Sequence, residues 1–406
     1  MDSERTYAGK FLEESLGLAV GDIDAESVPS ELVEGISSAM RGEATAASEE
    51  PLLERSIQEY GAVAIASIEE KRGHVLLKER WPGGARYASC LTHDVDNLSR
   101  PLSHIVRRRG RFTTSDFLLG MMGLRQLYDN ISLVAGLEST RRLRSSFYLL
   151  TANYDLRRKS NQLNSLTRAG WDIGLHGDFG THDSQSKMAR ALSDFHGATG
   201  IRPTGVREHF LKFDYGKTWG IMEELGFAYD TTVGNTDTLG FRLGLCTPFH
   251  PPDESWRPRR ILELPLVLMD VTLWGYLKRT EEEGLGDFDR LKRHVAGVNG
   301  LFTILWHPEA ARMKGGRIYP SLLDELLKDG CFIGSGRDIT DWWSIRGRPL
   351  ALEGNTYTMD DAPSGLVLRF KDKGGRKFAA EGGTVGVDGD PNAIKATGGP
   401  LRVRVS

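Results

Sequence analysis

The stretch RYASCLTHDVD (residues 86–96) combines a short apolar run with a cluster of charged residues at its end. A run of this length and composition is typical of a buried β-strand. Similar runs recur between residues 144 and 335, where they alternate with helical patterns that end at glycines. Such alternation is typical of a parallel sheet covered by helices. The sequence therefore predicts an α/β fold, a (β/α) barrel over residues 85–348.

Two flanking regions differ from this pattern. Residues 1–84 are rich in Glu and Ser, and we expect short helices there, followed by a strand pair over residues 61–82. Residues 350–406 alternate apolar and polar residues between Gly, Asp and Pro turns. This alternation predicts a small β-rich C-terminal appendage, for which a structural cap is favoured over a carbohydrate contact.

Composition and charge restrict the functions open to the chain. Its 406 residues include 52 Lys plus Arg and 55 Asp plus Glu, a formal net charge of -3. Without a basic excess, a general binder of nucleic acids or anionic membranes is not expected. The three cysteines are widely spaced and form neither a disulfide framework nor a zinc-finger pattern. No export signal and no membrane-length apolar run is found, so we expect a soluble, cytoplasmic protein without stable membrane insertion.

Polar residues gather at one end of the predicted strands. THDVD (92–96), HGD (176–178), REHF (207–210) and WHP (306–308) all lie at or just beyond the carboxyl ends of apolar runs. In α/β barrels this rim carries sites built from several loops, whereas the opposite rim serves stability. We therefore expect the functional site at this rim.

The pair Asp94 and Asp96 is the first candidate within the rim. In an extended strand the two carboxylates point to the same side and repel each other unless a cation or proton lies between them. An isolated pair of this kind more often caps a turn, but the loop HGDFGTHD (176–183) adds two histidines and two acids. A carboxylate–imidazole set suits Zn²⁺, and also Co²⁺ or Ni²⁺, with an open position for water.

Two further residues complete a hydrolytic site. Arg207 is a candidate to orient an aspartate through a bidentate ion pair. His307 follows a nearly apolar strand and could protonate a leaving amine, since its reference pKa near 6.5 lets it gain and lose a proton near neutral pH. The alternative for His307 is a buried structural histidine.

In order and content, these motifs resemble those of the polysaccharide deacetylase family (NodB homology, carbohydrate esterase family 4), in an atypical branch. The matching segments, over about residues 85–345, are LTHDVD (91–96), GLHGDFGTHD (174–183), VREHFL (206–211), AYDTTVGNTDTLGFRLGLCTPF (228–249) and ILWHP (304–308). The resemblance implies a distorted (β/α) barrel of seven strands. It also implies a divalent metal cofactor, with Zn²⁺ favoured over Co²⁺ or Ni²⁺.

The resemblance further assigns roles to individual residues. The catalytic residues that it implies are Asp94 as general base, Arg207 as the orienting cation and His307 as general acid. The metal ligands that it implies are Asp96, His176 and His182. The candidate substrate contacts are Phe210, Asp230 and Trp306, with Asp230 as the acid of the fourth motif.

The second motif departs from the family pattern, in which a second histidine follows the first by four residues. Here that position is Gly180, and the next histidine is His182. The third ligand is therefore His182 in a longer loop, or else Asp178 or His209. The third motif also lacks its usual proline.

These observations predict metal-dependent removal of the acetyl group from an N-acetylated sugar in polysaccharide or glycoconjugate biosynthesis. The expected partner is a carbohydrate substrate and not a nucleic acid, and the oligomeric state stays open. Two alternatives also stay open: hydrolysis of another non-peptide carbon–nitrogen bond, and a catalytically inactive carbohydrate-binding barrel. The presence of both a base and an acid argues against the inactive barrel, because binding needs neither.

Overall fold

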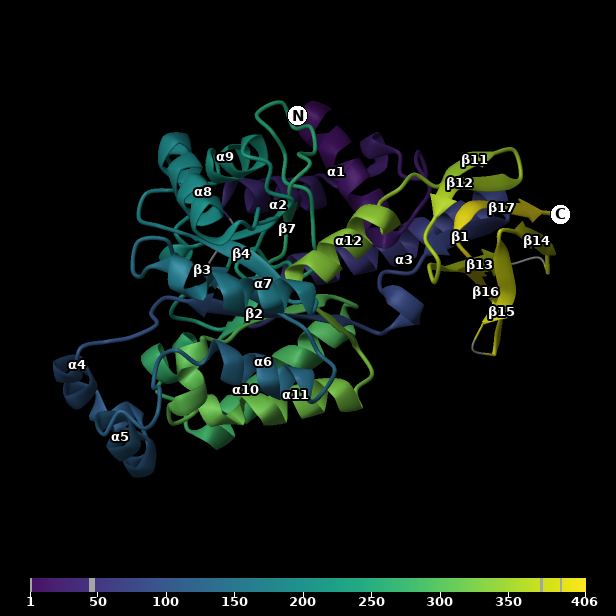
Figure 1. The fold of residues 1–406 in the computed structure, drawn as a ribbon. Coiled ribbons are helices and arrows are strands. Elements are labelled where there is room, and N and C mark those ends of the chain that lie inside the picture. The colour runs from purple at the N-terminus through teal and green to yellow at the C-terminus, as the bar shows by residue number, and fades with distance from the viewer. Residues whose placement is uncertain (1, 44–47, 373–374, 388) are drawn as a thin grey trace.

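The computed structural model describes residues 2–43, 48–372, 375–387 and 389–406. Its centre is a curled parallel sheet (Figure 1). The strand order is β7-β6-β5-β4-β3-β2-β9-β8, and β10 pairs with the start of β2. The strands are β2 (Ala88–Val95), β3 (Ser146–Leu149), β4 (Asp172–Gly177), β5 (Gly205–Glu208), β6 (Tyr229–Asp230), β7 (Leu262–Glu263), β8 (Leu266–Met269), β9 (Leu301–Leu305) and β10 (Phe332–Gly334). Every residue of β2 is buried, as expected for a parallel strand covered on both faces.

The sheet is a distorted barrel, which confirms the predicted fold class. Its two end strands, β7 and β8, are separated along the chain only by Leu264 and Pro265, so the chain itself links the two edges. Proline has no N–H to donate to a strand ladder, and the strand is interrupted there. The described residues therefore form eight strand segments in the path, with β10 in addition, where seven strands were predicted.

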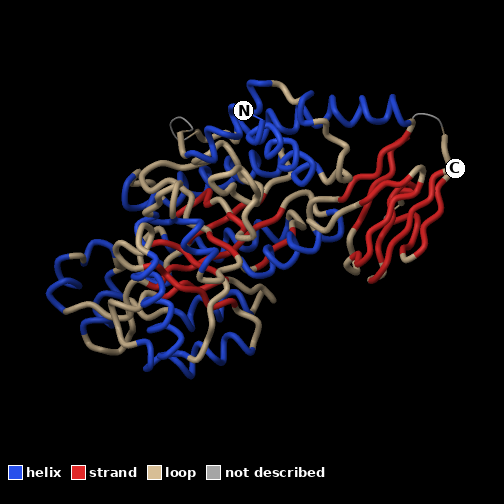
Figure 2. Tube along the Cα trace, turned by 90° about the horizontal axis from the view of Figure 1, so that it is seen from above, coloured by secondary structure: helices blue, strands red, loops and turns tan. Residues whose placement is uncertain are grey.

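Helices surround the sheet (Figure 2). They are α6 (Ile131–Ser139), α7 (Ser160–Arg168), α8 (Gln185–Thr199), α9 (Thr218–Glu224), α10 (Glu281–Gly297), α11 (Tyr319–Lys328) and α12 (Gly336–Arg346). Between β2 and α6 the chain makes an excursion that contains α4 (Leu102–Arg107) and α5 (Thr114–Met121), and both short helices extend away from the barrel in Figure 1. No described helix is long and apolar enough to cross a membrane.

The N-terminal flank consists of α1 (Asp2–Leu16), α2 (Ser30–Arg41), α3 (Leu52–Arg72) and β1 (His74–Lys78). The prediction of a strand pair over residues 61–82 was wrong for its first half, because residues 61–72 continue α3. The buried residues of α3 are Glu54, Ile57 and Gly61, which lie three to four residues apart as on one helical face.

The C-terminal appendage is built from two antiparallel sheets, with strand orders β1-β13-β16-β15 and β11-β12-β17-β14. Its strands are β11 (Ala351–Glu353), β12 (Thr356–Ala362), β13 (Val367–Asp372), β14 (Phe378–Glu381), β15 (Gly383–Val387), β16 (Asp390–Ala396) and β17 (Gly399–Val405). The predicted β-rich appendage is confirmed, with one addition. Strand β1 of the N-terminal flank pairs with β13, so that His74 lies opposite Asp372.

Candidate active site

The candidate site lies beyond the carboxyl ends of the barrel strands. Asp94 is near the end of β2, and Asp96 follows that strand directly. His176 on β4 pairs in register with Arg207 on β5, and His307 follows shortly after β9. Because neighbouring parallel strands bring their carboxyl ends to the same edge, residues far apart in the sequence become neighbours here.

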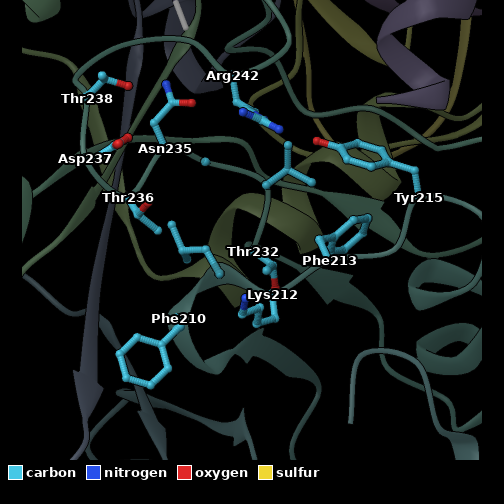
Figure 3. Close-up of a pocket in the computed structure, with 13 residues that line it drawn as sticks. Phe210, Lys212, Phe213, Tyr215, Thr232, Asn235, Thr236, Asp237, Thr238 and Arg242 are labelled. Carbon is cyan, nitrogen blue, oxygen red and sulfur yellow. The ribbon is translucent and has the colours of Figure 1, made fainter. Parts of the chain in front are cut away.

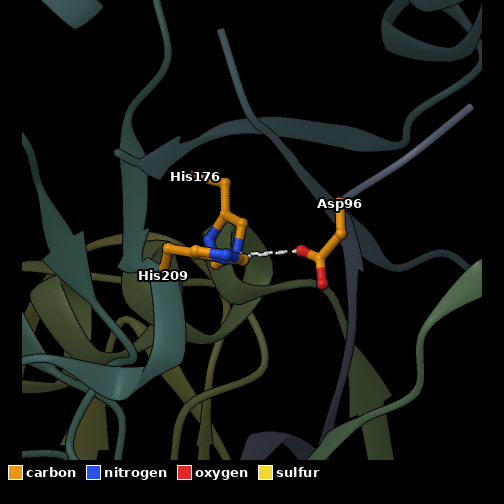
Figure 4. Close-up of side chains that lie close together, drawn as sticks. All are labelled: Asp96, His176 and His209. Atoms are coloured by element: carbon orange, nitrogen blue, oxygen red, sulfur yellow. Dashed lines mark hydrogen bonds and ion pairs between the residues drawn. The ribbon is translucent and has the colours of Figure 1, made fainter. Parts of the chain in front are cut away.

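Asp96, His176 and His209 form a compact group of potential metal ligands (Figure 4). Oδ1 of Asp96 lies 3.3 Å from Nε2 of His176 and 3.6 Å from Nδ1 of His209. The two imidazole nitrogens are 3.1 Å apart. One carboxylate and two imidazoles at these spacings suit a single divalent cation.

The hydrogen bonding of His176 leaves its Nε2 available to a cation. Its Nδ1 lies 2.8 Å from the main-chain carbonyl oxygen of Arg207, which can only accept, so Nδ1 carries the hydrogen. In the neutral ring, Nε2 then presents a lone pair towards Asp96 and His209. Oδ1 of Asp96 is buried and has no aligned hydrogen-bond donor among the described residues. A buried carboxylate oxygen without a donor, next to two imidazoles, fits a divalent metal.

The surrounding charges also favour positive charge at this point. Burial alone would raise the pKa of Asp96, but the three neighbouring histidines outweigh burial and lower the pKa. Burial alone would lower the pKa of His176, but the carboxylates of Asp94 and Asp96 raise it. Two carboxylates thus face this point, and protons or a cation must balance their charge.

His182, which the family resemblance implies as the third ligand, is not part of this group. Its Nε2 lies 3.9 Å from Asp183 of the same loop, and its main-chain carbonyl accepts a hydrogen bond from Thr218. The structure groups His209 with Asp96 and His176 instead, which is one of the alternatives that the sequence left open.

A strained turn follows His209. Strand β5 ends at Glu208, and Phe210 and Leu211 then adopt left-handed backbone conformations with φ of 57° and 52°. Such φ values are unfavourable for large side chains and persist only where the surrounding structure enforces them. Directly before this turn, the ring of His209 lies edge-on to that of His176, with 5.0 Å between the ring centroids.

Arg207 is completely buried and holds Asp94 through one nitrogen. Nη1 donates to Oδ1 of Asp94 at 2.9 Å. Nε donates to the main-chain carbonyl oxygen of Thr231 at 2.9 Å, and Nη2 donates to the hydroxyl oxygen of Thr231 at 3.0 Å. The bidentate pair expected from the sequence is therefore not formed: Asp94 bonds to Nη1 alone, whereas Nε and Nη2 donate to Thr231.

Arg207→Lys is expected to lower kcat by roughly 10–100-fold, the range typical for residues that orient a metal site from behind its ligands. A lysine has one nitrogen and cannot donate to Thr231 and Asp94 from the fixed planar fork of an arginine. The measurement is kcat together with the metal content after dialysis, which should stay unchanged. Arg202→Lys, at an exposed position, is the matched control. Wild-type kcat in Arg207→Lys would remove Arg207 from the mechanism.

His307 forms a buried pair with Asp270, a residue that the sequence analysis did not single out. Nδ1 of His307 donates to Oδ1 of Asp270 at 2.7 Å, and its main-chain N–H donates to Oδ2 at 2.9 Å. Burial alone would lower the pKa of His307, but Asp270 outweighs burial and raises it to about 10. Nε2 of His307 lies 3.7 Å from Oδ2 of Asp96. Asp270 directly follows the apolar strand β8, so the strand-end pattern of the other rim residues could have identified it.

Comparison with solved structures agrees with this architecture. The chain superposes on a protein from Mycobacterium smegmatis described as a polysaccharide deacetylase, with a TM-score of 0.51 and 18% identity, over 67% of this chain and 96% of that one. The barrel has the polysaccharide deacetylase fold.

Two further matches carry related descriptions. A polysaccharide deacetylase from Pseudomonas aeruginosa PAO1 matches with a TM-score of 0.46 and 17% identity, over 65% of this chain and 93% of that one. The Puue allantoinase matches with a TM-score of 0.45 and 18% identity, over 65% of this chain and 92% of that one. No family model and no curated protein matches the sequence.

In this polysaccharide deacetylase fold, only one of the three candidate substrate contacts reaches the surface. Trp306 is completely buried, and its ring stacks on Tyr319 with 5.5 Å between the ring centroids. Asp230 is also completely buried. Phe210 is exposed and lines a cavity of about 460 Å³ (Figure 3). Because a side chain without exposed surface cannot contact a bound sugar, this structure favours supporting roles for Trp306 and Asp230.

Asp230 belongs to a row of three buried carboxyl groups at the ends of β5, β6 and β7. It lies opposite Glu263 in the β6–β7 register, and Glu208 ends the neighbouring strand β5. Burial raises the pKa of Asp230 to about 6 and that of Glu208 to about 8. Burial, together with the charge of Asp230, raises the pKa of Glu263 well above its usual range. Burial thus favours the protonated form of all three groups, and they lie apart from the ion pair of Asp94 with Arg207.

Proposed function

We propose that this protein is a metal-dependent hydrolase that removes the acetyl group from an N-acetylated sugar. The observation that carries the proposal is a candidate base and a candidate acid beside the same ligand group. Oδ2 of Asp94 lies 3.6 Å from Nε2 of His176, and Nε2 of His307 lies 3.7 Å from Oδ2 of Asp96. A binding module needs neither group, whereas hydrolysis of an amide uses both.

The metal ligands in this proposal are Asp96, His176 and His209. Zn²⁺ is favoured, with Co²⁺ or Ni²⁺ as alternatives, because the donors are one carboxylate and two imidazoles without a thiolate. A bound metal would polarise the acetyl carbonyl and lower the pKa of a water molecule to about 7. Proton transfer, and the positioning of the groups that transfer protons, belong to side chains of the protein.

Asp94 is the general base in this mechanism. Its ion pair with Arg207 fixes Oδ1, so that Oδ2 is the atom that accepts a proton from the attacking water. Arg207 is a positioning residue, because its donors reach only Asp94 and Thr231 among the described residues. Its buried charge orients the base without taking part in proton transfer.

His307 is the general acid. Asp270 accepts from Nδ1 and fixes the orientation of the ring, so Nε2 is the atom that gives a proton to the departing nitrogen. Protonation of that nitrogen lets the carbon–nitrogen bond break with release of acetate and a free amino sugar. Asp270 is therefore a positioning residue for the acid.

Two exposed aromatic side chains support a carbohydrate substrate. Phe179 and Phe210 lie beside each other with 5.6 Å between their ring centroids, and both rings contact the ring of His209. Aromatic walls with a few placed polar groups are typical of sites that bind small ligands. The cavity of about 460 Å³ that Phe210 lines has room for a sugar unit.

The test combines metal analysis of the purified protein with acetate release from a panel of free, nucleotide-linked and lipid-linked N-acetyl sugars. The proposal expects about one metal per chain, and acetate release that stops with a chelator and returns with Zn²⁺. Bound metal with hydrolysis of other amides, and without acetate release, would indicate a different amide hydrolase. Neither metal nor hydrolysis would indicate a carbohydrate-binding barrel.

Asp270→Asn is expected to move the alkaline limit of activity to lower pH. The acid must be protonated, so activity is present below the pKa of His307 and is lost as pH rises through about 10. Without the carboxylate of Asp270, that pKa falls towards its ordinary value near 6.5. The measurement is kcat against pH at constant metal content. Asp324→Asn, at an exposed carboxylate that pairs with Arg141, is the control, and an unshifted limit in Asp270→Asn would contradict the assignment.

A further inference from the structure

The excursion between β2 and α6, residues 97–128, forms a separate lobe on the barrel. Helices α4 and α5 extend outwards in Figure 1. A small apolar core holds the lobe together, formed by Ile105, Phe112, Leu127 and Tyr128. Phe112 also forms a β-bridge with Met313, beyond β9. The lobe thus has a core of its own, and it is attached to the rest of the protein next to the segment that follows His307.

This lobe is strongly basic in a chain of net charge -3. Residues 97–128 contain six arginines and a single acidic residue, Asp116. Asp116 is already paired, with Arg125 at 2.5 Å and with Arg317 at 2.7 Å. The five other arginines form no ion pair within the described part of the chain, and they are Arg100, Arg107, Arg108, Arg109 and Arg111. All five are exposed.

The same lobe exposes large apolar side chains. Fifteen large hydrophobic residues of the described chain are exposed, and five of them fall within residues 102–124. They are Leu102 (58% exposed), Val106 (40%), Leu118 (54%), Met122 (69%) and Leu124 (69%). Leu102 and Val106 are four residues apart on α4, and Leu118 and Met122 are four residues apart on and just beyond α5, so each pair shares one side of its helix.

We propose that residues 97–128 dock this protein onto the surface of a bilayer that contains anionic phospholipids. Exposed leucine and methionine side chains beside unpaired arginines are the combination that binds the interface of such a bilayer, with apolar groups at the acyl boundary and cations at the headgroups. A nucleic acid would use the arginines but would leave the apolar side chains in water. Because this excess of basic over acidic residues lies in one lobe of a chain with net charge -3, the contact is local and peripheral.

The lobe also lies next to the candidate site. The lobe begins directly after Asp96, a candidate ligand, and Arg317 bonds to Asp116 of the lobe. A bilayer bound to the lobe would therefore lie near the rim where the substrate enters. This placement points to an N-acetylated sugar on a membrane-embedded lipid carrier as the substrate, an inference that rests on the proposed function. The docking itself does not depend on that function.

The experiment measures binding of the full chain to phosphatidylcholine vesicles with and without phosphatidylglycerol, by co-sedimentation. We expect binding only with phosphatidylglycerol and weakening at high salt. Each arginine near such a surface contributes roughly a fivefold change in affinity, so R107S/R108S/R109S should bind on the order of 100-fold more weakly. L118S/M122S should also bind more weakly, because both side chains would leave the acyl boundary.

Matched controls separate the lobe from the rest of the surface. R190S/R260S/R293S removes three exposed arginines elsewhere, and V20S/V63S removes two exposed apolar side chains elsewhere. Both controls should bind as the wild type does. The proposal is overturned if the wild type does not bind anionic vesicles, or if a control loses as much affinity as a lobe variant. It is also overturned if single-stranded RNA displaces the protein from the vesicles completely. Vesicle binding is read without turnover, so failure of the proposed hydrolysis would leave this result unaffected.

Discussion

Asp94→Asn is expected to lower kcat by about 10²–10⁴-fold while the protein keeps its metal. Asparagine has the shape of aspartate and can still accept the hydrogen bond from Arg207 through its carbonyl oxygen. Its amide nitrogen, in the place of Oδ2, cannot accept a proton from water. The ligand group of Asp96, His176 and His209 is untouched by the change. The measurement is kcat on an N-acetyl sugar, with the metal content determined on the same preparation.

Asp183→Asn is the matched control, since it makes the same chemical change at a loop carboxylate that pairs with His182. It should keep wild-type kcat. Two results for Asp94→Asn would contradict the assignment. A kcat within a few-fold of wild type would mean that the base is elsewhere, and loss of the metal would make Asp94 a ligand.

His209→Ala is expected to weaken metal binding by more than about 100-fold, beyond the 10–100-fold typical of residues that only support the ligands. The variant removes one of two imidazoles that lie 3.1 Å apart, and it leaves Asp96 and His176 to hold the ion. His182→Ala should keep the metal, because His182 lies outside the ligand group. The measurement is the metal that each variant retains after dialysis against a metal buffer, with a thermal melt to confirm folding.

The opposite pattern would restore the ligand set that the family resemblance implies. If His182→Ala lost the metal and His209→Ala kept it, the loop at residues 176–183 would have to rearrange when the metal binds. Asp96→Ala and His176→Ala should lose the metal under either ligand set. If both of these variants kept it, the metal would lie elsewhere.

The fold class and the location of the site were predictable because both depend on local patterns. Apolar runs of strand length between helices specify a parallel sheet, and the parallel direction brings the carboxyl ends together. Asp94, Asp96, His176, Arg207 and His307 each end or follow such a run. Their common edge could therefore be inferred without knowledge of side-chain contacts.

The strand-end pattern marks His209 and Asp270 as rim residues, but it does not show which residues they contact. His209 directly follows β5 and meets His176 because β4 and β5 are neighbours in the sheet. Asp270 meets His307 because β8 and β9 are neighbours, although a long helix separates them in the sequence. Pairs of this kind become visible only when the strand order is known.

The wrong prediction for residues 61–72 has a different cause. The segment GAVAIAS alternates small and apolar residues, which satisfies the period of a strand. It directly continues a helix that begins at Leu52, and adding a residue to an existing helix is far easier than starting a new element. Val63 is consequently exposed, although a strand pattern would have buried it.

The pairing of β1 with β13 has a consequence for the order of events during synthesis. His74 pairs with Asp372, which lies far away in the sequence. Bringing two such distant residues together has a high cost in loop-closure entropy. Strand β1 is synthesised before the barrel, and its edge stays unpaired until β13 has been made. During that time the unpaired edge can pair with other chains. The two sheets of the appendage can therefore be completed only after β17 has been synthesised, and a chain truncated before residue 367 would keep that edge open permanently.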